Sequence, residues 1–305
     1  MKLGIVMEGG ASRTIFSCGV TDVLMDENIY PDYLIGVSAG IAYGVSYASA
    51  QRGRNAEFTR KYMGERCYMG LHHFLNPKKR CYYNLDFAFG EVPNRLVPYD
   101  YEALANYPGR VVAVVTNIAT GEAEYFDIPP YETHWETTIA SCSLPVLFPP
   151  VQLNGNYYLD GGLADPVPYR KAMQEGCDRI VVILTRERDY VKEKESGTAV
   201  VNFAYRKYPR ITELMKQRAD SYNKLTEDLL EEERRGNIFL IAPRETFGVG
   251  RTEGKWELLK KLYQEGIDVA REQMEALKEY IFGSFTAETR ENAGQSGETL
   301  CRLYR

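Results

Sequence analysis

The sequence has little histidine and no strong excess of either charge. It holds three histidines among 305 residues, and 37 basic against 42 acidic side chains leave a net charge of −5. Nucleic-acid-binding domains usually show a clear basic excess, so this composition argues against a nucleic-acid partner. Hydrophobic residues make up 44% and charged residues 26% of the chain. These proportions are ordinary for a globular protein with a buried core.

Long apolar segments are also missing. No window approaches the roughly 18 consecutive apolar residues that indicate a membrane-spanning helix. The N-terminal stretch MKLGIVMEGG has a short apolar run and no small-residue cleavage site, so it does not fit a signal peptide. We therefore expect a cytoplasmic protein whose contact with a membrane, where it has one, is peripheral.

The cysteines are scattered and form no CxxC pair. They are Cys18, Cys67, Cys81, Cys142, Cys177 and Cys301. Without a secretion signal they are most simply free thiols in a reducing compartment. The histidines do not stand at ligand spacing with them, which argues against a zinc site.

Two strand–turn–helix units open the chain. Residues 3–7 are an apolar run that ends in Glu8-Gly9-Gly10, and helical spacing follows over 13–27. A second short strand is expected at 33–35, followed by a helix to about residue 52. Strands alternating with helices in this way predict an α/β fold with a parallel sheet.

The rest of the chain continues the α/β pattern up to a polar end. Residues 54–110 have little clean periodicity and predict short helices and loops. Further strands are expected at 111–115, 157–159, 179–184 and 238–241, and helices at 211–235 and 254–282. We expect one domain over 1–283, with core motifs in 3–185 and a helical C-terminal part over 205–283. Residues 284–305 are polar and glycine-rich and predict a disordered tail.

The segment Gly36-Val37-Ser38-Ala39-Gly40 has the G-x-S-x-G pattern between a predicted strand and a predicted helix. In a nucleophile elbow, the serine stands on a strained turn, and the two glycines let strand and helix approach closely. Ser38 is therefore the candidate nucleophile. The alternative is a tight turn that happens to contain a serine.

A glycine pair follows the first predicted strand. Gly9 and Gly10 expose backbone amides at the start of a helix, where they can hold a phosphate or an oxyanion. The letters G-G-A-S-R-T fit neither the G-x-G-x-x-G dinucleotide motif nor a P-loop. An oxyanion hole, with Arg13 as additional positive charge, is the remaining functional interpretation. The alternative is a structural turn with Arg13 on the surface.

The third candidate is Asp160-Gly161-Gly162, at the end of a predicted strand. Its carboxylate could act as the base for the serine, although an Asp-Gly turn is common. A catalytic triad would need a histidine base. His72 and His73 lie in a basic, irregular stretch, and His134 comes before the aspartate rather than after it. A Ser–Asp dyad is therefore the better hypothesis.

These three segments together resemble the patatin-like phospholipases. The segments are Gly9–Arg13, Gly36–Gly40 and Asp160–Gly162, and the loop ASCSLPVLFPPV before the aspartate also looks like the family's. Order and spacing agree over residues 3–185. The resemblance implies a three-layer sandwich with a mainly parallel central sheet and helices on both faces.

The resemblance also implies a chemistry. Ser38 and Asp160 would form the dyad, the backbone of Gly9, Gly10 and Ala11 would form the oxyanion hole, and Arg13 would lie nearby. The substrates would be acyl esters of lipids, cleaved through an acyl-enzyme without a metal or cofactor.

Two departures keep a second hypothesis open. The family usually has glycine where this chain has Ala11 and Thr14. Alanine tolerates a positive φ less well than glycine, which affects the oxyanion turn more than the nucleophile. The alternative is a non-catalytic member that binds lipid or protein. A nucleotide-binding α/β protein is disfavoured by the failed phosphate-loop patterns.

The segment 186–235 mixes basic and apolar residues, among them Arg206, Lys207, Arg210 and Arg218. It could cover the site or contact anionic lipid. The alternative is a solvated helix packed on the domain.

Overall fold

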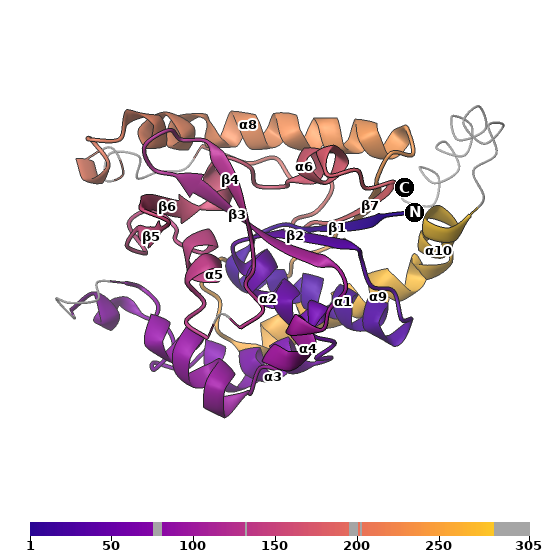
Figure 1. Ribbon diagram of the computed structural model, residues 1–305, viewed down its shortest axis with the longest axis horizontal. Coiled ribbons are helices and arrows are strands. Elements are labelled where there is room, and N and C mark those ends of the chain that lie inside the picture. Colours follow the sequence, from indigo (N-terminus) through magenta and orange to yellow (C-terminus); the bar gives the residue numbers. More distant parts are fainter. Residues whose placement is uncertain (76–80, 132, 195–200, 202, 284–305) are drawn as a thin grey trace.

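A computed structural model of the protein describes residues 1–75, 81–131, 133–194, 201 and 203–283. Within these residues, one eight-stranded sheet lies between helical layers (Figure 1). The strand order is β5-β6-β3-β2-β1-β7-β8, and β4 pairs with β3 off this path. The α/β sandwich predicted from the sequence is confirmed. The tail predicted from residue 284 lies outside the described residues.

The centre of the sheet is parallel and one edge is antiparallel. The parallel strands are β1 (Leu3–Met7), β2 (Tyr33–Val37), β3 (Arg110–Asn117), β7 (Arg179–Ile183) and β8 (Phe239–Ile241). The antiparallel strands are β4 (Ala123–Asp127), β5 (Val151–Leu153) and β6 (Asn156–Asp160). Every residue of β1 and β2 is buried, because helices cover the sheet on both faces.

The helices fall into two layers (Figure 1). On one face lie α6 (Tyr169–Gln174) and α8 (Pro209–Arg234), whose buried side chains pack with alternate residues of the strands. On the other face lie α1 (Ile15–Asp26), α2 (Ala39–Ala48), α9 (Trp256–Glu272) and α10 (Met274–Phe282). The shorter helices are α3 (Arg54–Phe58), α4 (Tyr101–Ala105) and α5 (Glu136–Ser141).

Several predicted boundaries differ from the structure. The second strand continues to Val37, directly before the candidate nucleophile. The helix expected over 254–282 is broken at Gln273 into α9 and α10. The segment 54–110 does contain short helices, two of which (Thr59–Met63 and Asp86–Leu96) have π-helical hydrogen bonding. Among the described residues, no helix combines the length and apolarity needed to cross a membrane.

The sheet brings Ser38 and Asp160 to one edge. Parallel strands end on the same side, so the residues after β1, β2 and β7 lie close together. Strand β6 runs antiparallel to β3, with Asp160 opposite Val115, and Val114 in turn lies opposite Val37. The end of β6 therefore lies level with the end of β2, and only β3 separates the two strands.

Candidate active site

Ser38 occupies a tight strand-to-helix turn. Its φ is 54° and its ψ is −128°, an unfavourable conformation for a residue with a side chain. Its carbonyl oxygen accepts hydrogen bonds from Ile41 and Ala42 at the start of α2. A Cβ at Gly36 would lie 2.7 Å from Ile41 N, and one at Gly40 would lie 2.4 Å from Met7 O. The two glycines are therefore required by backbone contacts that leave no space for a side chain.

A second serine holds this turn from the side. The Ser38 amide donates to Ser141 Oγ at 2.8 Å, and Ser141 Oγ donates to Val114 O at 2.7 Å. Ser141 is the last residue of α5 and is fully buried. The backbone of Ser38 is thus tied to both α5 and β3 through one hydroxyl group.

Asp160 lies beside Ser38 and is 2% exposed. Its Oδ1 accepts a hydrogen bond from the Gly162 amide at 2.8 Å. Burial raises the pKa of Asp160, whereas the Ser38 hydroxyl, the Gly162 amide and the charges of Arg218 and Arg251 act to lower it. Asp160 Oδ2 forms no hydrogen bond of normal geometry with any of the described residues.

The glycine turn lies between β1 and the short helix η1 (Ala11–Thr14). Within the described part of the chain, the amides of Gly9, Gly10 and Ala11 donate no hydrogen bond to the protein. A Cβ at Gly9 would lie 2.9 Å from Ser38 Cβ, so the turn directly adjoins Ser38. Three amides without a protein acceptor next to a serine are what an oxyanion hole requires.

Ala11 adopts a φ of 50° in this turn. The conformation expected of glycine is therefore kept with alanine, at a strain of about 1–2 kcal/mol. Thr14, the second departure, is fully buried at the end of η1.

Arg13 is buried rather than on the surface, with 6% of its area exposed. Burial lowers its pKa to about 10, the charges of Arg186 and Arg251 add to this effect, and Glu8 opposes it. Its Nε has no hydrogen-bond partner among the described residues. The structural alternative weighed for Arg13, a surface residue beside a turn, is therefore wrong.

Glu8 connects three elements directly before the glycine turn. It is 4% exposed, and its Oε2 accepts hydrogen bonds from the Thr185 amide at 2.6 Å and the Thr185 hydroxyl at 3.0 Å. Its Oε1 accepts one from the Tyr222 hydroxyl at 2.6 Å. This buried carboxylate therefore links the ends of β1 and β7 to α8.

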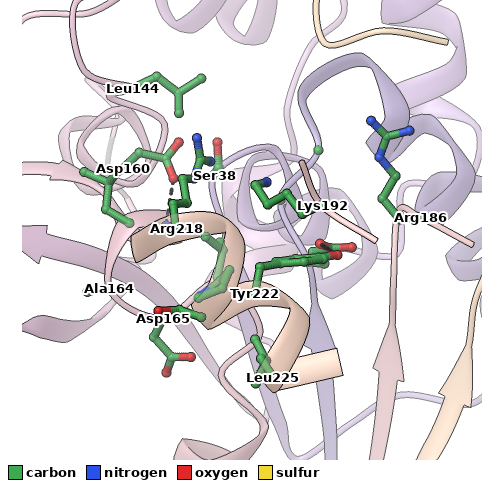
Figure 2. A pocket seen from close by; sticks show the side chains of 18 of the residues that line it. Ser38, Leu144, Asp160, Ala164, Asp165, Arg186, Lys192, Arg218, Tyr222 and Leu225 are labelled. Carbon is green, nitrogen blue, oxygen red and sulfur yellow. Dashed lines mark hydrogen bonds between the residues drawn. The ribbon is translucent and has the colours of Figure 1, made fainter. Parts of the chain in front are cut away.

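Ser38, Asp160, Glu8, Arg13 and the glycine turn line one pocket of about 280 Å³. Figure 2 shows Asp160 and Leu144 at one side and Arg186 at the other, with Ser38, Lys192 and Tyr222 between them. Its basic lining side chains are Arg13, Arg170, Arg186, Lys192, Arg218 and Arg251. Its apolar ones are Ala11, Val37, Leu144, Leu163, Ala164, Pro166, Leu214 and Leu225. A mixed pocket of this kind can hold an apolar chain and a charged group at once.

Helix α8 forms one wall of the pocket. Leu214, Arg218, Ser221, Tyr222 and Leu225 all lie along this wall. The hypothesis that segment 186–235 covers the site is therefore supported. By contrast, Arg206, Lys207 and Arg210, the residues considered for lipid contact, do not line the pocket.

The histidines lie elsewhere. None of the three lines the pocket, and the rings of His72 and His73 contact the Arg66 carbonyl on an exposed segment. The described residues also contain no cluster of three or more His, Cys, Asp or Glu side chains that could hold a metal ion. Cys142, by contrast, is near the nucleophile: burial raises the pKa of its thiol, and the Ser38 hydroxyl interacts with it.

Sequence reasoning missed several groups around the site. It assigned no role to Glu8, Ser141, Arg186, Tyr222 or Arg251. One signal was present: Arg218 and Tyr222 stand four residues apart on α8, on the same face as buried Leu225 and Leu229. Polar residues on the apolar, buried face of a helix indicate that polar partners lie buried opposite them.

The fold and site define an α/β protein with a serine at a strand-to-helix elbow and a buried aspartate beside it. The family model described as "Patatin-like phospholipase" matches residues 5–173, more than half of the chain. The chain therefore belongs to the patatin-like phospholipase family. A second model, "Domain of unknown function (DUF6363)", matches residues 208–282.

Related proteins agree with this family. The uncharacterized protein YjjU of Escherichia coli is 26% identical over 187 residues, which cover 60% of this chain and 52% of that protein. Lysophospholipase NTE1 of Candida glabrata is 25% identical over 304 residues, which cover 92% of this chain and 17% of that protein. The chain thus spans about half of the first and a small part of the second.

Among solved structures, VipD from Legionella pneumophila aligns over 90% of this chain and 67% of its own, with a TM-score of 0.46 and 15% identity.

Proposed function

We propose that this protein is a serine acyl-ester hydrolase that acts on lipids, with Ser38 as nucleophile and Asp160 as base. The observation that supports this most directly is the position of Ser38 between a buried carboxylate and three amides that donate to no acceptor among the described residues. The names of the yeast relatives, lysophospholipases, point to the same substrate class.

The reaction uses the Asp160 carboxylate twice. It takes the Ser38 hydroxyl proton as Oγ attacks the ester carbonyl carbon, and the resulting oxyanion is bound by the amides of Gly9, Gly10 and Ala11. The bond to the alcohol oxygen then breaks, and that oxygen receives the proton from Asp160. Water next gives a proton to Asp160 and attacks the acyl-enzyme. The carbonyl re-forms, Ser38 regains its proton, and the fatty acid leaves.

Electrostatics in the pocket support these roles. The base must be ionised to work, and the charges of Arg218 and Arg251 favour ionisation against the effect of burial. The apolar lining residues Leu144, Leu163 and Leu214 offer contacts for the acyl chain. A cytoplasmic location and peripheral membrane contact stay predictions from the sequence.

The test is labelling with a fluorophosphonate probe, together with hydrolysis of nitrophenyl butyrate. We expect the probe to modify Ser38, and we expect Ser38→Ala and Asp160→Asn each to remove hydrolysis. Ser46→Ala is a matched control, because Ser46 is a buried serine on α2 that does not line the pocket. Hydrolysis that survives Ser38→Ala would contradict the assignment. A folded protein that is neither labelled nor active would favour the alternative, a non-catalytic lipid- or protein-binding member.

A further inference from the structure

One end of the molecule carries large apolar side chains that the protein leaves exposed. Phe203 is 73% exposed, and Leu71 and Leu75, at the two ends of the short helix η3 (Leu71–Leu75), are 74% and 83% exposed. Figure 1 shows the segment around η3 (purple) and the start of α8 at the same end of the molecule as β5 and β6. A single exposed apolar side chain is ordinary, but several on one part of a surface indicate an interaction site.

Hydrogen bonds connect these two segments through the loop that precedes β5. The Gly70 amide donates to the Tyr82 carbonyl at 2.9 Å, and the Tyr82 amide donates to the Leu147 carbonyl at 2.9 Å. On the other side of that loop, the Val146 amide lies 3.5 Å from the Tyr205 hydroxyl. The η3 segment and the segment before α8 therefore lie on either side of one loop.

The same loop and the segment before α8 both reach the pocket. Leu144, at the start of the loop, lines the pocket. Tyr205 is buried in an apolar cluster with Leu163, and Leu214 packs against that cluster. Leu163 and Leu214 also line the pocket. The exposed apolar end of the molecule is therefore joined to the pocket walls by direct packing.

Basic side chains surround Phe203. From Phe203 to Glu213 the chain contains one acidic residue, Glu213 itself, and three exposed basic residues, Arg206, Lys207 and Arg210. The Arg206 guanidinium lies 5.1 Å from the centre of the Phe203 ring, and Arg210 Nη1 lies 3.4 Å from Glu213 Oε2. This segment therefore has two positive charges that no carboxylate within it balances. The whole chain has a net charge of −5, so a local excess of this kind is needed to attract an anionic surface.

An anionic lipid bilayer matches both kinds of side chain at once. Apolar side chains enter the boundary between headgroups and acyl chains, and basic side chains bind the lipid phosphates. Phe203 and Arg206 present both kinds at one point of the surface. The neighbouring pocket, in turn, is proposed to act on acyl lipids.

We propose that a docking surface made of Leu71, Leu75, Phe203, Arg206 and Lys207 binds an anionic lipid bilayer and brings the pocket to the membrane. The three apolar side chains enter the interface, and the two basic side chains contact lipid phosphates. This inference rests on the proposed function, because it assigns the surface through which the same pocket receives its lipid.

Sedimentation with vesicles tests the docking surface. Ser38→Ala protein, which leaves the lipid intact, would be mixed with phosphatidylcholine vesicles and with vesicles of equal parts phosphatidylcholine and phosphatidylglycerol. We expect tighter binding to the anionic vesicles, and added salt should weaken it. Replacing Arg206 and Lys207 together by glutamine should weaken this binding about 30-fold, because each basic residue near an anionic surface contributes about fivefold. Phe203→Ser should weaken it about tenfold, as should Leu71→Ser combined with Leu75→Ser.

Matched controls lie at the opposite end of the molecule. Arg234 and Arg235 are adjacent exposed arginines at the end of α8, and replacing both by glutamine removes the same charge. Phe282, at the end of α10, is an exposed phenylalanine like Phe203. Figure 1 shows α10 at the other end of the molecule from the start of α8. We expect the arginine double variant and Phe282→Ser to bind the anionic vesicles as the parent protein does. A control that weakens binding as much as its counterpart would overturn the proposed surface.

Hydrolysis of nitrophenyl butyrate separates this inference from the proposed function. The ester is soluble, so the docking variants, made in protein that keeps Ser38, should hydrolyse it as the unchanged protein does. Vesicle binding that depends on the docking surface, without hydrolysis of any ester, would support docking and overturn the hydrolase. Hydrolysis without vesicle binding, or with equal binding to both kinds of vesicle, would overturn docking alone. Binding unchanged in any of the three docking variants would do the same.

Discussion

Replacing Ser141 by alanine should loosen the turn that holds the nucleophile. The Ser141 hydroxyl accepts from the Ser38 amide and donates to the Val114 carbonyl, and all three residues are buried. Leaving a buried amide without a partner costs about 1–3 kcal/mol, and the lost bond to the carbonyl adds about 0.5–1.5 kcal/mol. We therefore expect the free energy of unfolding to fall by about 2–4 kcal/mol, a large share of the 5–15 kcal/mol typical of a folded domain.

The same change should lower activity. The φ of 54° at Ser38 is strained, and such a conformation persists only while its surroundings enforce it. Without the bond to Ser141, the turn can relax and Ser38 can shift relative to Asp160. A displacement of about 1 Å in a reacting group can reduce the rate about 100-fold, so we expect kcat/KM for nitrophenyl butyrate to fall by about 10- to 100-fold.

Ser143→Ala is the matched control. Ser143 is equally buried and two residues away, but its hydroxyl donates to the Ile139 carbonyl, which also accepts from the Cys142 amide. In Ser143→Ala the Ile139 carbonyl keeps the hydrogen bond from the Cys142 amide, so no buried polar group is left without a partner. The free energy of unfolding should therefore fall by about 1 kcal/mol or less. Urea unfolding and ester hydrolysis would be measured on both variants. If Ser141→Ala behaves like Ser143→Ala in both assays, the reasoning about the elbow is refuted.

Two further predictions concern the charge of the proposed base. Asp160→Asn should remove hydrolysis yet raise the free energy of unfolding at neutral pH by about 0.5–2 kcal/mol, because burial raises the pKa of Asp160 and disfavours its ionised form in the folded state. This gain in unfolding free energy should shrink as the pH falls from neutral toward the ordinary carboxyl range. Urea unfolding that shows the same gain at neutral pH and at the lower pH would contradict the prediction. Arg218→Gln should move the acidic limb of the kcat/KM profile to higher pH, because the Arg218 charge lowers the pKa of Asp160. An acidic limb that stays in place would show that the two groups are not coupled.

The elbow could be predicted from the sequence because its requirements are local. Gly36 and Gly40 are four positions apart in the sequence, and each is needed where a Cβ would contact nearby backbone. Strand, turn and helix follow one another within about 20 residues, so hydrophobic spacing and glycine positions identify them together. The same holds for the glycine turn after β1.

Other parts of the site depend on packing between distant segments. Tyr222 and Glu8 are 214 residues apart, and Ser141 and Ser38 are 103 apart. Hydrophobic spacing places α8 as a helix but does not say against which strands it packs or in which register. The break at Gln273 was missed for a related reason, because apolar residues continue at helical spacing on both sides of it.

The groups that complete the pocket lie beyond the matched patatin segment, which ends at residue 173. Arg186 follows β7, whereas Arg218 and Tyr222 lie on α8, inside the second matched segment, residues 208–282. Tyr222 holds Glu8, and Glu8 directly precedes the amides of the glycine turn. Without α8, Glu8 Oε1 would lose the hydrogen bond from the Tyr222 hydroxyl and would be buried without a partner. The geometry of the glycine turn therefore depends on that helix. The proposed active site therefore includes residues of both matched segments.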